Sequence, residues 1–251
     1  MTSERTLSSG VTVFVPAFNE ERNISAAVHK VFDAATQAGV SDYEVLIVND
    51  GSLDGTASIA REMAGTFERV RYLENPRNLG LGASLRRALE EARYEKFIIV
   101  AGDNDASLTM VTELLSSRDQ ADLVIAYCVN KQLRGRLRCA ISDLYSRIYT
   151  DSFGLRLRYI NGTAIYPTAR MRSLGFNSTR FSIAAEIIVK LLRSGCAYRE
   201  IPGQIQNSLS PSSSLNFRSA LEVARSYFRL LWEVYVLEKH RYSAKPRYVR
   251  D

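Results

Sequence analysis

The stretch Phe97-Ile98-Ile99-Val100-Ala101-Gly102-Asp103-Asn104-Asp105 decides how this chain is expected to fold. Its five leading apolar residues predict a strand buried on both faces, as strands of parallel sheets are. Asp103 and Asp105 follow where that strand ends, and open α/β sheets bind ligands outside the carboxyl ends of their strands. Carboxylates on a rigid edge suit a hard divalent cation that bridges a diphosphate. We therefore expect a metal site here, with a plain acidic turn as the alternative.

Strand and helix patterns alternate on both sides of this stretch. Alternation with short connections predicts an α/β fold in which a mostly parallel sheet is flanked by helices. The second half is less regular and ends in a long amphipathic helix. The predicted strands are 11–15, 44–48, 70–73, 97–101, 122–127 and 161–167, and the predicted helices are 20–38, 55–66, 78–93, 134–153, 181–193 and 216–240, with a serine-rich loop at 208–214.

Composition narrows the class of protein. The chain has 251 residues, of which 46% are hydrophobic and 24% charged, so it can bury a sizeable core. No apolar run reaches the length of a membrane span, and residues 1–10 are polar, without a signal region. We expect those ten residues to be flexible and the protein to be cytoplasmic, with peripheral attachment to the inner membrane face as a further option.

The cysteines and histidines exclude two kinds of site. Cys128, Cys139 and Cys196 are odd in number and widely spaced, which fits a reducing compartment rather than a disulfide framework. His29 and His240 lie far apart in the sequence, so a histidine-rich zinc site is not expected.

Basic residues gather in two segments, although the net charge is only +6. Residues 131–158 contain seven basic and two acidic side chains, and residues 217–251 contain eight and four. Either segment could meet phosphate or an anionic membrane, or be a solvated helix face. No nucleic-acid recognition module accompanies the charge, so we do not expect nucleic acid as a partner.

Four loops should line one edge of the predicted sheet, because each follows a strand. They offer glycines for close backbone approach, carboxylates for a nucleoside or metal, and a helix start facing phosphate. Neither a P-loop nor a dinucleotide-binding glycine pattern is present. The pattern predicts a nucleoside-diphosphate site built from residues 16–20, 49–56, 78–82 and 102–105.

The segments V-P-A-F-N-E-E, V-N-D-G-S-x-D-G-T and N-x-G-x-G resemble the family 2 inverting glycosyltransferases of the GT-A fold. The later segment FSIAAEIIVKLLRSGCAYREIP is similar to the branch with dolichol-phosphate mannose synthase and other polyprenyl-phosphate glycosyltransferases. The resemblance covers about residues 10–206. It implies a Rossmann-like GT-A domain over 11–215, with a nucleotide-sugar half (11–127) and an acceptor half (128–215). A C-terminal amphipathic helix and basic tail (216–251) would follow.

The resemblance also implies donor-site roles. Asp50 would hydrogen-bond the nucleobase, and Asp103 would be the main ligand of Mg²⁺ or Mn²⁺ held against the diphosphate of a UDP- or GDP-sugar, with Asp105 as second ligand. Read from the sequence alone, Asp50 could instead be a turn residue, and Gly80 and Gly82 helix-start glycines. The remaining donor-site candidates are Pro16, Ala17, Phe18, Glu20, Gly51 and Ser52.

This chain departs from the family pattern at three places. Ala101 occupies the first position of the usual Asp-x-Asp triplet, and Cys128 stands where an arginine is usual. The phosphate-clamping R-x-x-G-x-S loop is matched by residues 207–213, which lack its arginine and glycine. An acceptor phosphate or hydroxyl would therefore meet other candidates. These are Arg134, Arg136, Arg138 and Ser208, with Asn161 and Gly162 as the floor of the acceptor pocket.

Glu186 is the candidate acid–base residue, because it interrupts an apolar helical stretch and must be paired or functional there. A raised pKa would suit a general base for a hydroxyl acceptor, whereas a phosphate acceptor is already ionised. The alternative is a structural pair with an arginine such as Arg180. The C-terminal helix, with Trp232 and Tyr235, could lie on a membrane, pack on the catalytic domain or form a homodimer.

These observations predict an inverting, metal-dependent glycosyltransferase whose acceptor is a polyprenyl phosphate or a related lipid or glycan. One alternative acts on a saccharide or small-molecule hydroxyl. Another is a non-catalytic GT-A protein that binds a nucleotide sugar or a partner.

Overall fold

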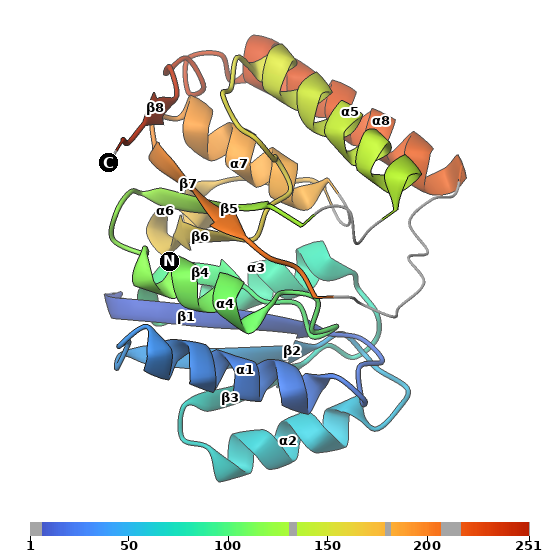
Figure 1. Cartoon of the computed structure of the whole chain (residues 1–251). Coiled ribbons are helices and arrows are strands. Elements are labelled where there is room, and N and C mark those ends of the chain that lie inside the picture. Colours follow the sequence, from blue (N-terminus) through green and yellow to red (C-terminus); the bar gives the residue numbers. More distant parts are fainter. Residues whose placement is uncertain (1–6, 131–134, 179–181, 207–216, 251) are drawn as a thin grey trace, which may run out of the picture.

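A single eight-stranded sheet organises the chain in the computed structural model, which describes residues 7–130, 135–178, 182–206 and 217–250. The strand order is β3-β2-β1-β4-β6-β5-β7-β8. Among the described strands, β6 pairs antiparallel with its neighbours β4 and β5, and all other pairs are parallel (Figure 1). The strands are β1 (Ser8–Ala17), β2 (Tyr43–Asn49), β3 (Val70–Glu74), β4 (Tyr94–Ile99), β5 (Leu123–Cys128), β6 (Ala164–Pro167), β7 (Ala197–Gly203) and β8 (Arg247–Tyr248).

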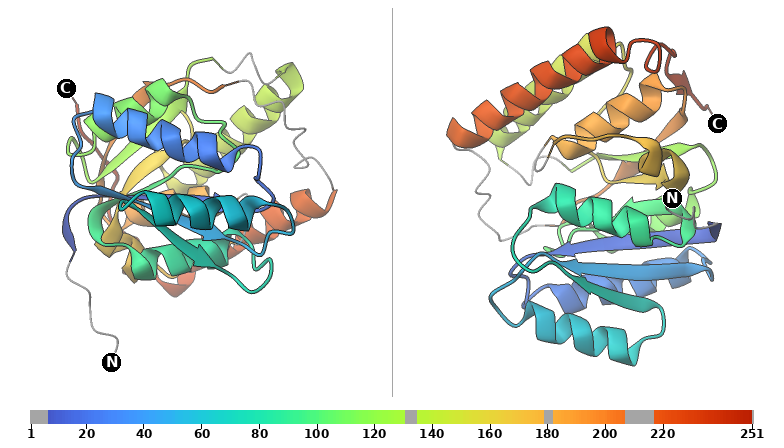
Figure 2. Two further views of the ribbon diagram at one scale, coloured as in Figure 1. Left: turned by 90° about the horizontal axis from the view of Figure 1, so that it is seen from below. Right: turned by 180° about the vertical axis from the view of Figure 1, so that it is seen from behind.

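Helices cover both faces of the sheet, as the alternating pattern predicted. The helices α1, α2 and α4 bury one face, and α3, α6 and α7 bury the other, where α5 and α8 add an outer layer (Figures 1 and 2). The helices are α1 (Ile24–Gln37), α2 (Thr56–Thr66), α3 (Leu81–Glu91), α4 (Leu108–Ser116), α5 (Arg136–Phe153), α6 (Thr168–Ser173), α7 (Ile183–Arg193) and α8 (Phe217–Trp232).

Alternation along the central strands explains the two cores. Phe14 and Leu46 point to the α3 side, while Val13, Val45 and Ile47 point to the α1 side, and all five are fully buried. Successive side chains of a strand face opposite ways, so a strand covered on both faces must be apolar throughout. The predicted α/β fold class is confirmed.

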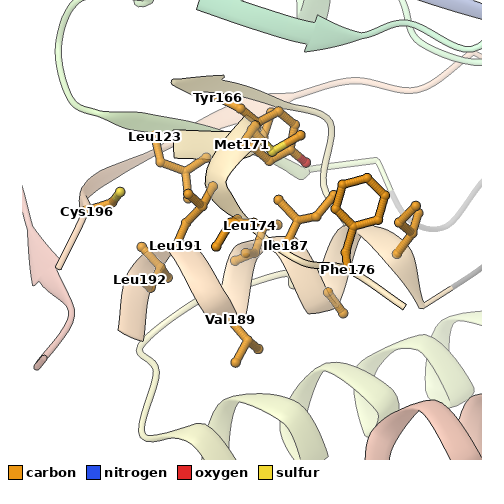
Figure 3. Close-up of a cluster of buried hydrophobic side chains, with 14 of the residues drawn as sticks. Leu123, Tyr166, Met171, Leu174, Phe176, Ile187, Val189, Leu191, Leu192 and Cys196 are labelled. Carbon is orange, nitrogen blue, oxygen red and sulfur yellow. The ribbon is translucent and has the colours of Figure 1, made fainter. Parts of the chain in front are cut away.

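The acceptor half is held together by the apolar cluster around α7. Ile187 and Leu191 of that helix lie with Leu123 of β5 and Tyr166 of β6, and Met171 of α6 closes the cluster (Figure 3). Burying large side chains of this kind is worth about 1.5–3 kcal/mol each. The cluster therefore fixes α7 firmly against the sheet.

The C-terminal segment is part of the same body. Tyr227 of α8 packs on Tyr149 of α5, with ring centroids 5.2 Å apart. The helix continues as a π-helical segment, η2 (Glu233–Leu237), and the chain then returns to pair β8 with β7. No described helix has the length and hydrophobicity needed to cross a bilayer.

Several elements differ from the sequence-based expectation. Helices α4 and α6 and strands β7 and β8 were not predicted. The first strand begins at Ser8 rather than at residue 11, because Ser8 N donates to Arg93 O at 2.9 Å. Residues 1–6, and the predicted loop at 208–214, lie outside the described part of the chain.

Candidate active site

The loops after β1 and β2 are joined by side-chain-to-backbone hydrogen bonds. Asn19 N donates to Ser52 Oγ at 3.0 Å, and Leu53 N donates to Asn19 Oδ1 at 2.9 Å. Glu20 N donates to Thr56 Oγ1 at 2.7 Å. Asn19 has φ 57°, a left-handed conformation that asparagine adopts more readily than most residues. The two loops therefore form one preorganised wall, as the order of strands predicted.

Asp50 ties the second loop to the third. Its buried carboxylate accepts hydrogen bonds from Asn75 Nδ2 at 2.7 Å, Leu79 N at 3.0 Å and Gly80 N at 2.8 Å. Gly51 beside it has φ 69°, and a Cβ there would lie 2.4 Å from the Arg77 carbonyl carbon. Asp50 thus closes a turn, and three of the roughly four acceptor positions of its carboxylate are used within the protein.

The acidic triplet forms a tight loop after β4. Gly102 N donates to Pro16 O at 3.2 Å, and Asp105 N donates to Asp103 Oδ1 at 3.1 Å. Asn104 between the two carboxylates has φ 65°. These contacts hold Asp103 beside the β1 loop, at the edge where the sequence placed it.

Charges from several loops meet at this edge. Burial raises the pKa of Glu20, a hydrogen bond from Asn23 opposes the rise, and the negative charges of Asp103 and Asp54 add to it. Burial lowers the pKa of Lys30, while Asp103 and Asp105 act in the opposite direction. The edge is thus acidic, with one buried ammonium beside it.

The donor set fits a divalent cation that is shared with a substrate. Within the described residues, no three histidine, cysteine or acidic side chains are grouped so as to enclose a metal. Mg²⁺ is commonly held by only one or two carboxylates together with substrate phosphates and water. Asp103 and Asp105 suit that incomplete arrangement, in which a diphosphate would supply further oxygens.

The predicted floor of the acceptor pocket lies against β5. A Cβ at Gly162 would lie 2.0 Å from Ala126 O, so only glycine fits this close approach. The neighbouring Asn161 has a buried Oδ1 without a hydrogen-bond partner in the structure. Cys128, at the position of the usual arginine, donates to Asn130 Oδ1 at 3.3 Å. The side-chain amide of Asn130 in turn donates to Ile205 O and accepts from Ile205 N. These two hydrogen bonds join the end of β5 to the segment after β7.

The basic acceptor candidates are only partly described. Arg136 is exposed and Arg138 half-buried at the start of α5. Arg134 and Ser208 lie outside the described residues, as does Arg180, the suggested partner of Glu186. For these three positions the sequence-based predictions stay predictions.

Glu186 differs from the expectation in its electrostatics. It is 4% exposed and accepts hydrogen bonds from Asn177 N at 2.9 Å, Ser178 N at 2.8 Å and Lys190 Nζ at 2.8 Å. Burial alone would raise the pKa of Glu186, but the charge of Lys190 and these hydrogen bonds together lower it. The raised pKa that would suit a general base is not what the structure gives, because the anion is paired and surrounded by protein donors.

Two buried lysines were missed by the sequence analysis. Lys190 bridges Glu186 and Glu233, at 2.8 and 2.6 Å, and joins α7 to η2. Lys30 lies on α1, four positions before Ala34, on the same side as apolar residues. Both lysines lie on the apolar face of an amphipathic helix, and this position in the sequence pattern could have indicated that they are buried.

Comparisons with known proteins agree with this geometry. A sequence model of glycosyl transferase family 2 matches residues 12–181. Dodecaprenyl-phosphate galacturonate synthase of Rhizobium johnstonii is 31% identical over 136 residues, 52% of this chain and 39% of that protein. Dolichyl-phosphate beta-glucosyltransferase ALG5D of Trichomonas vaginalis is 29% identical over 103 residues, 39% of this chain and 32% of that protein. The chain thus spans less than half the length of these curated relatives.

The fold has solved counterparts. Glucosyl-3-phosphoglycerate synthase from Mycobacterium tuberculosis, crystallised with Mn²⁺, UDP-glucose and phosphoglyceric acid, superposes with a TM-score of 0.66 at 17% identity. The match covers 89% of this chain and 80% of that one. At this identity the likeness establishes the GT-A fold.

Proposed function

The chain belongs to glycosyl transferase family 2, and we propose that it transfers a sugar, with inversion, from a UDP- or GDP-sugar to a lipid-phosphate acceptor. One observation carries the proposal: the Asp103–Asp105 loop is fixed at the carboxyl edge of β4, against the joined loops of β1 and β2. Such an edge binds ligands in open α/β sheets.

We propose the donor roles from the family resemblance and from the position of the loops. Asp103 and Asp105 would hold Mg²⁺ or Mn²⁺, whose charge would neutralise the departing diphosphate. Pro16, Ala17, Phe18 and Glu20 would line the first wall for the nucleoside. Asp50 would accept from the base with its remaining acceptor position, while Gly51, Ser52, Gly80 and Gly82 allow the donor to approach the backbone.

The acceptor is proposed from the state of Glu186. A lowered pKa and three donors make this carboxylate a poor proton acceptor. An ionised phosphate needs no base, so this favours a phosphate acceptor over a neutral hydroxyl. The names of the two relatives, which act on prenyl phosphates, support the same class. Asn161, Gly162, Arg136 and Arg138 are the described residues we propose for acceptor binding.

We also propose that the outer face of α5 and α8 lies on an anionic bilayer. Ten of the fifteen exposed large hydrophobic side chains described are on these helices and η2. On α5 they recur at a spacing of three and four, which forms one stripe. Four described exposed basic side chains on these elements accompany two exposed acidic ones, and Lys and Arg near anionic headgroups add about 1 kcal/mol each. The apolar residues are Leu137, Ile141, Leu144, Ile148, Leu221, Phe228, Trp232, Tyr235, Val236 and Leu237, and the charged ones are Arg136, Arg147, Arg225, Arg229, Asp143 and Asp151.

Trp232 gives a direct test of this face, because it is the only tryptophan of the chain and is 58% exposed. Its fluorescence should shift to the blue with phosphatidylglycerol vesicles and hardly at all with phosphatidylcholine vesicles. Leu144→Ser with Phe228→Ser should abolish the shift, whereas Leu53→Ser, at a 92% exposed position away from the face, should not. A doubled mass by light scattering without vesicle binding would assign the face to a homodimer instead.

Thermal stability tests the donor site. UDP or GDP should raise the melting temperature only with Mn²⁺, since a ligand at 100 times its Kd adds about 2.7 kcal/mol. Asp103→Asn should lose the effect. Transfer from the stabilising sugar nucleotide to a short-chain prenyl phosphate, but not to simple saccharides, would support the acceptor class. Binding without any transfer would favour a non-catalytic donor-binding protein.

A further inference from the structure

Lys30 is a buried cation whose donors all point into the loop of the acidic triplet and the strand segment beside it. It is 9% exposed, and its Nζ donates to Asn104 O at 3.2 Å, to Ala106 O, and to Gln206 Oε1 at 3.2 Å. An ammonium has three donors, so these partners satisfy it completely. Burying such a group is costly unless it is paired in this way.

The same loop is held from its other side by the segment that follows β7. Ala106 and Ile205 form an antiparallel bridge, and Gln206 N donates to Asp105 O at 2.9 Å. Ser107 N donates to Gln204 O at 3.4 Å. Lys30 is therefore the junction of three separate pieces of chain: α1, residues 103–106 and residues 204–206.

This junction acts on a backbone that needs support. Asn104 has φ 65°, and its Oδ1 is buried without a hydrogen-bond partner in the structure. Residues held in this region persist when their surroundings fix them. The Lys30–carbonyl bonds constrain the Asn104–Asp105 and Ala106–Ser107 peptide groups, and the Asp103 side chain is hydrogen-bonded to Asp105 N.

We propose that Lys30 is a positioning residue that preorganises the Asp103–Asp105 loop for its divalent cation. The inference rests on the proposed function, because it concerns the ligands proposed there. Two effects of Lys30 on the cation oppose each other. Its positive charge repels a nearby metal ion, whereas its hydrogen bonds fix the backbone of the loop that carries both carboxylates. The three satisfied donors and the strained Asn104 indicate that positioning outweighs repulsion.

The test measures Mn²⁺ binding rather than turnover. Lys30→Met keeps the length of the side chain and removes all three donors. In the presence of UDP, we expect the Kd for Mn²⁺, read from the electron paramagnetic resonance of the free ion, to rise at least tenfold. Hydrogen exchange at the amides of residues 103–106 should become faster in the metal-free protein. An unchanged Kd, or a tighter one from the loss of repulsion, would overturn the inference.

Lys190→Met is the matched control, because Lys190 is also buried, also carbonyl-bound and belongs to α7. At a temperature where Lys190→Met is folded, its Kd for Mn²⁺ should lie within twofold of the wild-type value, even though its melting temperature is lower. Parallel changes in the two variants would mean a merely structural role for Lys30. Gln206→Leu removes one partner and leaves α1 intact, and it should raise the Kd about threefold; no rise would also count against the inference. Failure of the wild-type protein to bind Mn²⁺ with UDP would instead defeat the proposed function itself.

Discussion

Replacing Lys190 with methionine should strongly destabilise this protein. Lys190 is fully buried, and its ammonium lies 2.8 Å from Glu186 Oε1 and 2.6 Å from Glu233 Oε1. Methionine fills a similar volume, but it leaves two carboxylates in the interior without their cation. Removing one partner of a buried ion pair typically costs about 3–5 kcal/mol. For a domain of this size about 2–4 °C of melting temperature is lost per kcal/mol, so a fall of roughly 6–20 °C is expected.

Urea unfolding followed by circular dichroism at pH 7 measures this cost. The midpoint should fall while the dependence on urea stays unchanged, which would attribute the loss to stability rather than to compactness. The matched control is the triple variant Glu186→Gln, Lys190→Met and Glu233→Gln, which removes every charge of the network. It should recover most of the lost stability, since a neutral interior carries no uncompensated ion. A cost below about 1 kcal/mol for Lys190→Met alone would refute the reasoning, because it would mean that the carboxylates need no cation.

Three further predictions concern single positions. The pKa of Glu186 in the folded protein is below its ordinary value, so its contribution to stability is present above about pH 4.5 and is lost as the pH falls through the folded pKa. In urea titrations, the difference in stability between wild type and Glu186→Gln should therefore become smaller in acid. A difference that stays constant with pH would contradict this. Gly162→Ala should cost about 1–3 kcal/mol in thermal unfolding, because a Cβ would lie 2.0 Å from Ala126 O, whereas Gly175→Ala, with open space around the Cβ, should be nearly neutral. Asn104→Ala should cost about 1–2 kcal/mol and Asn104→Gly should not, because φ is 65°; equal melting temperatures would remove the strain argument.

The donor half could be predicted because its determinants are local in sequence. The segment from Asn49 to Gly51 contains the end of a strand, a carboxylate and a glycine whose φ of 69° only a flexible backbone tolerates easily. Each loop follows its strand directly, and parallel strands bring their carboxyl ends to one edge. The sheet and that edge therefore follow from patterns of a few residues.

The missed features depend on contacts between distant residues. Lys30 contacts Asn104 and Gln206, which are 74 and 176 positions away, and no local pattern relates them. The helix α4 had a readable start, since Ser107 Oγ accepts from Met110 N at 3.1 Å, but the acidic loop directly before it favoured irregular structure. The pairing of Glu186 with Lys190 is an i, i+4 pair that the sequence contained, whereas Glu233 comes from another helix.

The sequence predicts an amphipathic last helix, and the structure shows which of its apolar residues are buried. Leu221, Phe228 and Tyr235 of this segment are exposed. The buried apolar side chains of this segment are Leu230 and Val234, and Glu233 is buried beside them. A helix with apolar residues on two sides packs one side inward and leaves the other to a partner, and hydropathy alone does not rank the sides.

The network around Glu186 links the question of the acceptor to the packing of the C-terminal helix. A general base must release its partners in order to take a proton, and Glu186 would have to give up Lys190, which also holds Glu233 of η2. Proton uptake there would therefore weaken the contact between α7 and the segment whose outer face we propose for the bilayer. A phosphate acceptor avoids this conflict, because it attacks as an anion and leaves the ion network intact. The arrangement that makes Glu186 a poor base thus favours the phosphate acceptor that we propose.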